Sequence, residues 1–254
     1  MAWRAYEHVA MVLGLGFLAL LCLVWLPFAF VLNPLLPRTW GEPVGRRLIM
    51  VGFRIYLRFL ELVCACRFDL AELNGLRHEG PLVIVANHPS LLDAVMIISR
   101  LPNAVCVMKA ALMANPLFGA AARLARYIPN DAPITMVLKA SDQVAAGAHL
   151  LIFPEGTRTS SFPVDACTPA AGLIARRAGA PVQSLLIEFD SPYLGKHWPL
   201  FRKPDLPLHF RVRLGRRFAP PTDAAVFVRE IEDYFRAELR PVDAPAPLAR
   251  EAVS

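Results

Sequence analysis

The chain has 254 residues, a hydrophobic fraction of 56%, a mean hydropathy of +0.43 and a formal net charge of +6. This apolar composition makes an anionic lipid surface a better partner for the positive charge than nucleic acid, and no nucleic-acid-binding motif occurs. No His or Cys cluster has zinc-ligand spacing, and the five cysteines form no C-x-x-C pair. We therefore expect no metal, no nucleic acid, and free thiols in a reducing compartment.

The N-terminal part of the chain contains a long uncharged apolar segment. Residues 9–32 would form a helix about 36 Å long, which exceeds the roughly 30 Å hydrocarbon core of a bilayer. The segment is longer than the apolar core of a signal peptide and has no small-residue cleavage site, so we expect it to be retained. Pro27 lies within it, where a proline kinks or ends a helix. The pattern leaves open whether the helix spans the bilayer or re-enters it.

A second helix with a different pattern is predicted over residues 46–63. Four charged residues share one face at helical spacing, as in a helix that lies in the membrane interface: Arg47, Arg54, Arg58 and Glu61. Five arginines occur between residues 38 and 58, and only Arg4 precedes the apolar segment. The positive-inside bias then predicts an inner-membrane protein whose following domain is cytoplasmic. Residues 1–65 are therefore predicted to be membrane-anchoring helices.

From residue 66 onward, short apolar runs alternate with helical patterns, which predicts an α/β fold with a mostly parallel central sheet covered by helices. Strands are predicted at 67–73, 82–86, 104–108, 149–153, 183–189 and 209–214. Helices are predicted at 90–100, 116–125, 133–146, 169–179 and 223–239. The last helix is expected to begin at Thr222 as N-cap and to bury Phe227, Ile231, Phe235 and Leu239. The α/β domain would cover residues 66–240, followed by a disordered tail at 241–254 that is rich in alanine and proline.

The sequence NHPSLLD, residues 87–93, follows a predicted strand. On one continuous helix, side chains five residues apart point about 140° apart, too far for contact. Pro89 suits the first helical position, which would place His88 just outside the helix and Asp93 in its opening turns. The carboxylate would then reach one imidazole nitrogen. An imidazole oriented in this way is the usual general base for a weak hydroxyl nucleophile, and that hydroxyl can belong to the substrate.

The sequence FPEGTRT, residues 153–159, also follows a predicted strand. Gly156 permits a close backbone turn, and Arg158 offers a planar charged fork for phosphate or carboxylate. Glu155 would either hold this arginine or accept a hydrogen bond from a substrate hydroxyl. Either loop alone is most simply a structural turn.

Lys109 directly follows the predicted strand at 104–108, just as each of the two loops follows a predicted strand. All three follow strands, and the carboxyl edge of an open α/β sheet is where ligands bind. One functional site at this edge is therefore predicted.

With both loops considered, the sequence resembles the PlsC-like family of glycerolphosphate and lysophospholipid acyltransferases. NHPSLLD is similar to the family's N-H-x4-D block, and FPEGTRT is similar to its F-P-E-G-T-R-S/T block. MKAALMANPLFG, residues 108–119, is similar to its K-x-x-L…P-x-x-G segment. The resemblance covers roughly residues 80–190. It implies a membrane enzyme that transfers a fatty acyl group from acyl-CoA or acyl-carrier protein to a lipid hydroxyl, without a metal or organic cofactor.

By this resemblance, His88 is the base and Asp93 its orienting partner. The acceptor, including any phosphate, is expected to contact six residues: Glu155, Gly156, Thr157, Arg158, Lys109 and Asn130. The family usually has an arginine where this chain has Asn130, and a basic stretch where this chain has DACTPAAG at residues 165–172. The missing charges leave the acceptor open between 1-acylglycerol-3-phosphate and a different molecule, such as a specialised lipid or an aryl polyene.

Two other interpretations of the sequence predict different chemistry. A membrane-bound hydrolase would use Ser90 or Ser184 as nucleophile, although the chain contains no G-x-S-x-G motif. A non-catalytic lipid-binding protein would retain the fold and lose the dependence on His88.

Overall fold

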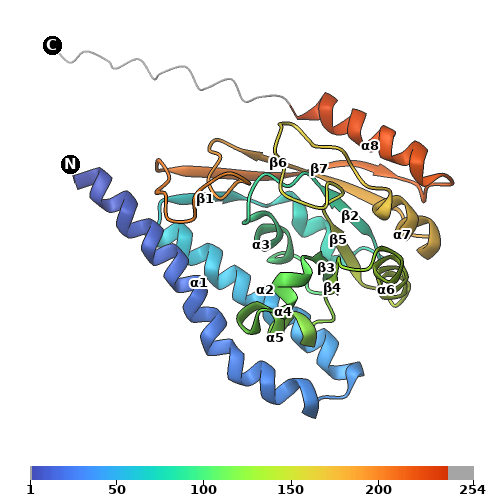
Figure 1. The fold of residues 1–254 in the computed structure, drawn as a ribbon, viewed down its shortest axis with the longest axis horizontal. Helices are drawn as coiled ribbons and strands as arrows, with labels where there is room; N and C mark the ends of the chain where they lie inside the picture. Colours follow the sequence, from blue (N-terminus) through green and yellow to red (C-terminus); the bar gives the residue numbers. More distant parts are fainter. Residues whose placement is uncertain (1, 240–254) are drawn as a thin grey trace.

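The computed structural model describes residues 2–239, which form two long N-terminal helices and an α/β domain (Figure 1). The helices are α1 (Ala2–Leu35), α2 (Arg38–Val63), the 3-10 helix η1 (Glu72–His78), α3 (Asp93–Ile98), α4 (Ala110–Ala114), α5 (Pro116–Leu124), α6 (Pro133–Ala145), α7 (Ala170–Ala178) and α8 (Ala224–Glu238). The strands are β1 (Cys66–Asp69), β2 (Val83–Ala86), β3 (Ala104–Met108), β4 (Ile128–Pro129), β5 (His149–Ile152), β6 (Val182–Phe189) and β7 (Leu208–Phe218). The tail predicted at residues 241–254 lies outside the described residues.

The strands form one sheet in the order β1-β7-β6-β2-β5-β3-β4. Every neighbouring pair is parallel except β6 and β7, which are antiparallel. The predicted mostly parallel sheet is therefore confirmed. Because β2, β5, β3 and β4 are adjacent and parallel, the loops that follow them lie at one edge of the sheet.

The central strands are apolar because helices cover both of their faces. Every residue of β2 and β5 is buried. One face packs in a core with α2, α3 and η1, and the other face packs with α6, α7 and α8 (Figure 1). This two-sided burial fixes the central strands and holds the loops at their carboxyl ends on a rigid base.

Helix α1 contains the uncharged segment and continues through Pro27, which does not end it. The helix is long and apolar enough to cross a membrane, with a mean hydropathy of 2.7 in its most apolar window. Only 17% of that window is buried against the rest of the protein. Such low burial is unlike that of a core helix, which makes α1 a candidate membrane span.

Helix α2 differs from the predicted arrangement of its arginines on one free face. The Arg54 Nε atom donates a hydrogen bond of 2.7 Å to the Ser99 carbonyl at the end of α3. A helix end leaves carbonyl groups without partners, and a guanidinium satisfies them well. Arg47 and Arg58 are exposed as predicted, and the exposed part of α2 also includes apolar side chains: Leu48, Val51, Ile55 and Leu62. The prediction of a single free arginine face is therefore wrong at Arg54.

Other differences from the predicted elements occur at element ends. Strand β1 ends at Asp69, and the chain then turns into η1, so the predicted strand to residue 73 is too long. Asp223, not Thr222, caps α8, because its carboxylate accepts hydrogen bonds from the Ala225 and Val226 amides at 2.7 and 3.1 Å. The stripe predicted for α8 is buried as expected. Strand β4 and helix α4 were not predicted, because elements this short carry no periodic pattern.

Candidate functional site

The loop that follows β2 is fastened to the sheet by Asn87. Its buried side-chain amide donates to the Ile187 carbonyl at 3.0 Å, and its carbonyl oxygen accepts from the Ile187 amide at 2.8 Å. This pair of bonds to β6 fixes the direction in which the chain leaves the sheet. Asn87 was not among the predicted site residues, although an asparagine directly after a buried strand is a recognisable turn signal.

His88 and Asp93 are in contact, as the sequence predicted. The imidazole Nδ1 atom lies 2.8 Å from Asp93 Oδ2, which also accepts a 2.8 Å hydrogen bond from the Ser90 amide. The route to this contact differs from the prediction, because Pro89 does not begin the helix. A turn carries residues 90–92, and Asp93 is the first residue of α3. This turn brings the His88 and Asp93 side chains together, whereas a continuous helix would have pointed them apart.

Asp93 is completely buried and lies at the start of a helix. Burial raises the pKa of its carboxyl above the ordinary value, and the hydrogen bonds from His88 and from the Ser90 amide act in the opposite direction. Its second oxygen, Oδ1, has no hydrogen-bond partner among the described residues. A buried carboxylate with its contacts concentrated on one oxygen holds the imidazole in a single orientation.

The His88 ring also stacks on a side chain from the second loop. The Phe153 ring is nearly parallel to it, at 13°, with the ring centroids 3.8 Å apart. The His88 side chain is 17% exposed, and its Nε2 atom has no hydrogen-bond partner within residues 2–239. Stacking and the Asp93 contact together fix the ring and leave Nε2 as the ring nitrogen without a partner among the described residues.

The two loops are joined by Glu155, which is buried rather than open to a ligand. Its Oε1 atom accepts from the His88 amide at 3.0 Å and from the Thr159 hydroxyl at 2.8 Å. Its Oε2 atom accepts from the Asp165 amide at 2.9 Å. The predicted pairing of Glu155 with Arg158 is absent from the described hydrogen bonds and ion pairs. Both carboxylate oxygens are therefore used to hold the backbone of the site.

Thr159 strengthens the same connection between the loops. Its amide donates to the His88 carbonyl at 2.8 Å, and its hydroxyl accepts from the His88 amide at 3.2 Å. Thr159 was not among the predicted site residues, although it closes the FPEGTRT motif. A threonine that pairs with the neighbouring loop cannot be told from a surface threonine without the fold.

Arg158 extends from the second loop to the connection between β6 and β7. Its Nη1 atom donates to the carbonyls of Leu194 and Gly195 at 2.9 and 2.7 Å. Ser90 reaches the same connection, because its hydroxyl donates to the Tyr193 carbonyl at 3.0 Å. The residues 193–195 thus support both motif loops, and no sequence pattern pointed to them.

Gly156 and Thr157 form the exposed tip of the second loop. Gly156 has a φ of +69°, a backbone conformation that other residues rarely adopt. Its amide already donates to the Phe153 carbonyl at 3.0 Å. The amides of Thr157 and Arg158 have no hydrogen-bond acceptor within residues 2–239, so they are the donors that this turn offers to a ligand.

Lys109 and Asn130 follow β3 and β4 at the same edge of the sheet, and both are exposed. The Asn130 side-chain oxygen accepts from the Ala110 amide at 3.1 Å, which fixes the backbone beside Lys109. Strands β2 and β3 are separated by β5 alone, so their ends lie about 10 Å apart. The structure therefore brings the predicted residues to one edge, with Asn130 farthest from His88.

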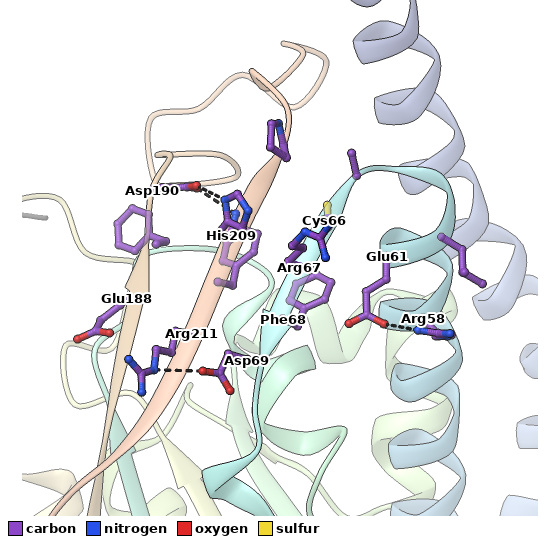
Figure 2. Close-up of a pocket in the computed structure, with 15 residues that line it drawn as sticks. Arg58, Glu61, Cys66, Arg67, Phe68, Asp69, Glu188, Asp190, His209 and Arg211 are labelled. Atoms are coloured by element: carbon purple, nitrogen blue, oxygen red, sulfur yellow. Dashed lines mark hydrogen bonds and ion pairs between the residues drawn. The ribbon is translucent and has the colours of Figure 1, made fainter. Parts of the chain in front are cut away.

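A cavity of about 900 Å³ lies elsewhere, over β1, β6, β7 and one side of α2 (Figure 2). Its charged residues pair largely with one another: His209 Nδ1 lies 2.7 Å from Asp190 Oδ2, and Arg211 lies 3.2 Å from Asp69. Within residues 2–239, no group of three or more His, Cys, Asp or Glu side chains is arranged to hold a metal ion. The convergent polar groups at the sheet edge, rather than this cavity, form the candidate site.

Replacement of Glu155 by glutamine is expected to lower the free energy of unfolding by about 1–3 kcal/mol. The new amide group presents a donor to one of the two backbone amides that now donate to the carboxylate. Burial raises the Glu155 pKa, so the folded state binds this proton more tightly than the unfolded state does. The parent chain should therefore lose stability as pH rises from the ordinary carboxyl pKa through the raised one, and the variant should show a smaller slope.

Thermal unfolding in detergent as a function of pH measures both effects. Glu230→Gln on the exposed side of α8 is the matched control, because its ion pair with Arg216 is solvent-exposed. Equal destabilisation by the two variants would contradict the role of Glu155 in joining the loops.

Comparison with known proteins gives three concordant results. The Acyltransferase family matches residues 67–188. A 1-acyl-sn-glycerol-3-phosphate acyltransferase from Pseudomonas aeruginosa is 27% identical over 182 residues, covering 69% of this chain and 67% of that protein. A protein of the same name from Helicobacter pylori is 34% identical over 105 residues, covering 37% of this chain and 44% of that protein.

Among solved structures, the 1-acyl-sn-glycerophosphate acyltransferase PlsC from Thermotoga maritima has the same fold. The TM-score is 0.69 at 16% sequence identity, and the alignment covers 93% of this chain and 98% of that one. The motif loops also lie within the residues that match the family. Residues 67–188 therefore resemble the Acyltransferase family, and the chain has the fold of a 1-acyl-sn-glycerophosphate acyltransferase.

Proposed function

We propose that this chain is a membrane-associated O-acyltransferase that moves a fatty acyl group from an acyl thioester to a lipid hydroxyl, with His88 as general base. The observation that carries the proposal is the His88–Asp93 contact of 2.8 Å, which leaves Nε2 without a partner in the described residues. A base oriented in this way can take the proton of a hydroxyl nucleophile. The match to the Acyltransferase family favours acyl transfer as the reaction.

In the proposed reaction, His88 Nε2 removes the proton of the acceptor hydroxyl as its oxygen attacks the thioester carbonyl. Asp93 stabilises the imidazolium that forms. The tetrahedral intermediate collapses by breaking the carbon–sulfur bond, and the proton on His88 passes to the departing thiolate. The products are an ester and a free thiol. The amides of Thr157 and Arg158, rather than that of Gly156, are the proposed donors to the oxyanion.

The acceptor is proposed to bind along the edge between His88 and Lys109. Arg158 and Lys109 supply positive charge for a phosphate, and Asn130 supplies an uncharged amide at the far end of the edge. Two relatives are 1-acyl-sn-glycerol-3-phosphate acyltransferases, which favours 1-acylglycerol-3-phosphate as the acceptor. A different lipid or an aryl polyene remains the alternative, and it is favoured by the lack of a second arginine at Asn130. The donor is acyl-CoA or acyl-carrier protein.

The membrane association is proposed from α1 and from the arginines that follow it. Helix α1 leaves its apolar surface exposed, and this surface would be covered by lipid. The positive-inside bias places the α/β domain on the cytoplasmic side of the inner membrane. Residues 1–65 would then be the anchor, and residues 66–240 the acyltransferase domain.

The test uses protein purified in detergent or nanodiscs, with labelled acyl-CoA and labelled acyl-carrier protein as donors. The acceptors are 1-acylglycerol-3-phosphate and extracted host lipids. His88-dependent transfer to 1-acylglycerol-3-phosphate would support phosphatidic acid synthesis. Transfer only to a component of the extract would support the alternative acceptor, and no His88-dependent transfer at all would favour the non-catalytic lipid-binding protein.

Ser90→Ala is expected to retain acyl transfer within about tenfold of the parent, because Ser90 acts on loop structure. Its hydroxyl is buried, donates to the Tyr193 carbonyl and accepts from the Leu92 amide at 3.3 Å. Ser184, the other candidate nucleophile, lies buried in β6 and donates to the Arg216 carbonyl at 2.7 Å. The measurement is the initial rate of acyl transfer to whichever acceptor the preceding test identifies. Complete loss of transfer in a folded Ser90→Ala variant would instead support the hydrolase interpretation.

A further inference from the structure

The connection between β6 and β7 carries an exposed apolar tip that the proposed reaction does not use. Phe201 is 79% exposed and Leu200 is 48% exposed. The adjacent stretch, residues 196–203, contains three cations and no acidic residue: Lys196, Arg202 and Lys203. Lys203 is paired with Glu7 and Asp205, which leaves Lys196 and Arg202 without an acidic partner among the described ion pairs. An apolar tip beside such cations is typical of a segment that enters the surface of an anionic membrane.

Residues 198–203, here called the tip loop, have a defined internal structure. Trp198 donates through its indole nitrogen to the Arg202 carbonyl at 2.9 Å, and the Arg202 guanidinium lies 4.6 Å above the indole ring. The Trp198 ring also meets Tyr193 edge to face, with centroids 5.8 Å apart. The tip loop is therefore held outward by these contacts, and the exposure of Phe201 is built into its structure.

The tip loop lies beside the start of α1, the candidate membrane span. Lys203 forms an ion pair with Glu7, and the Leu206 amide donates to the same carboxylate at 3.4 Å. Trp3, one turn from Glu7, is 54% exposed. Trp3 and the tip loop thus lie at the same end of α1. Since the α/β domain is proposed to be cytoplasmic, both reach one membrane interface when α1 re-enters the bilayer instead of spanning it.

The same connection also reaches the candidate site. Tyr193, which Trp198 contacts, accepts the hydrogen bond from Ser90, and the next two carbonyls hold Arg158. A contact made by Phe201 with lipid is therefore linked through one short connection to both motif loops.

We propose that Leu200 and Phe201 insert into the surface of an anionic bilayer, forming a second lipid contact that sets the orientation of the site toward the membrane. This inference rests on the proposed membrane function. The depth expected for such a contact is about 5–10 Å into the boundary between headgroups and acyl chains.

The test attaches an environment-sensitive fluorophore to Phe201→Cys in the full chain, reconstituted in vesicles of phosphatidylcholine and phosphatidylglycerol. Val226→Cys is the matched control, because Val226 is an apolar residue that is 52% exposed. It lies on α8, which packs on the face of the sheet opposite to the one that contacts Tyr193 and Leu206 of the β6–β7 connection. Burial raises the pKa of the four native thiols outside α1, and labelling of the parent chain gives the background. We expect lipids with a shallow quencher to quench the probe at 201 and not at 226. Equal quenching at the two positions would overturn the proposal.

A second measurement uses the Leu200→Ser, Phe201→Ser double variant, with Val226→Ser as control. Transfer to an acceptor embedded in vesicles should fall about tenfold, while transfer to a short-chain, water-dispersed acceptor should be unchanged, because burial of one large apolar side chain corresponds to at least that factor. An equal fall with both acceptors would contradict the lipid contact and indicate damage to the site. If the parent transfers no acyl group, the proposed function fails, whereas the fluorescence result still decides the lipid contact.

Discussion

Replacement of His88 by alanine is expected to lower the rate of acyl transfer by about 10²–10⁴-fold, the contribution usually made by a positioned general base. The imidazole is the group proposed to meet the acceptor hydroxyl, and Lys109, an exposed cation, is not arranged to replace it. The loss should appear in kcat, because the backbone of His88 is held by Glu155 and Thr159 independently of the ring. Single-turnover transfer from a labelled thioester measures this effect.

The chain provides a matched control for this variant. His209 is a second histidine paired through Nδ1 with an aspartate, at 2.7 Å from Asp190, and it lies in the cavity of Figure 2 rather than at the motif loops. His209→Ala should leave transfer within about threefold of the parent, as expected for a substitution of a surface pair. If both variants lost activity equally, the role of His88 as base would be contradicted.

Asp93→Asn is expected to lower kcat by about 10²–10⁴-fold with little loss of stability; the corresponding change in a Ser-His-Asp triad costs about 10⁴-fold. The asparagine preserves the size of the side chain but removes the negative charge that stabilises the imidazolium. The effect on stability is small because Asp93 Oδ1 has no hydrogen-bond partner among the described residues, and a buried charge is costly.

The pH dependence of unfolding tests the same residue independently of activity. Because burial raises the Asp93 pKa in the folded state, its stabilising contribution is present below the unfolded pKa and is lost as pH rises through the folded one. Asp93→Asn should remove this loss, and Asp190→Asn at the exposed pair should not. A variant that keeps full transfer, or that unfolds far below the parent temperature, would contradict the proposed role.

Several features of the fold were predictable because they depend on local pattern. Strands such as β2 and β5 appear in the sequence as continuous apolar runs, since helices cover both faces of the sheet. The stripe on α8 was predictable from its 3.6-residue period, whereas its true cap, Asp223, lies one position from the prediction. Arg54 was misplaced because its partner, the Ser99 carbonyl, is distant in sequence, and a helical spacing alone does not show which side faces the protein.

The sequence by itself determined the order of the longer elements, the two polar loops at the carboxyl ends of β2 and β5, and the long apolar N-terminal helix. These follow from apolar periodicity and from residue types whose preferences act over a few positions. Only the tertiary structure decided that Glu155 is buried between the loops, that Arg158 is held by the connection after β6, and that Phe201 lies exposed beside α1. The physical reason is that each of these features depends on contacts between segments far apart in the chain, which a local pattern does not encode.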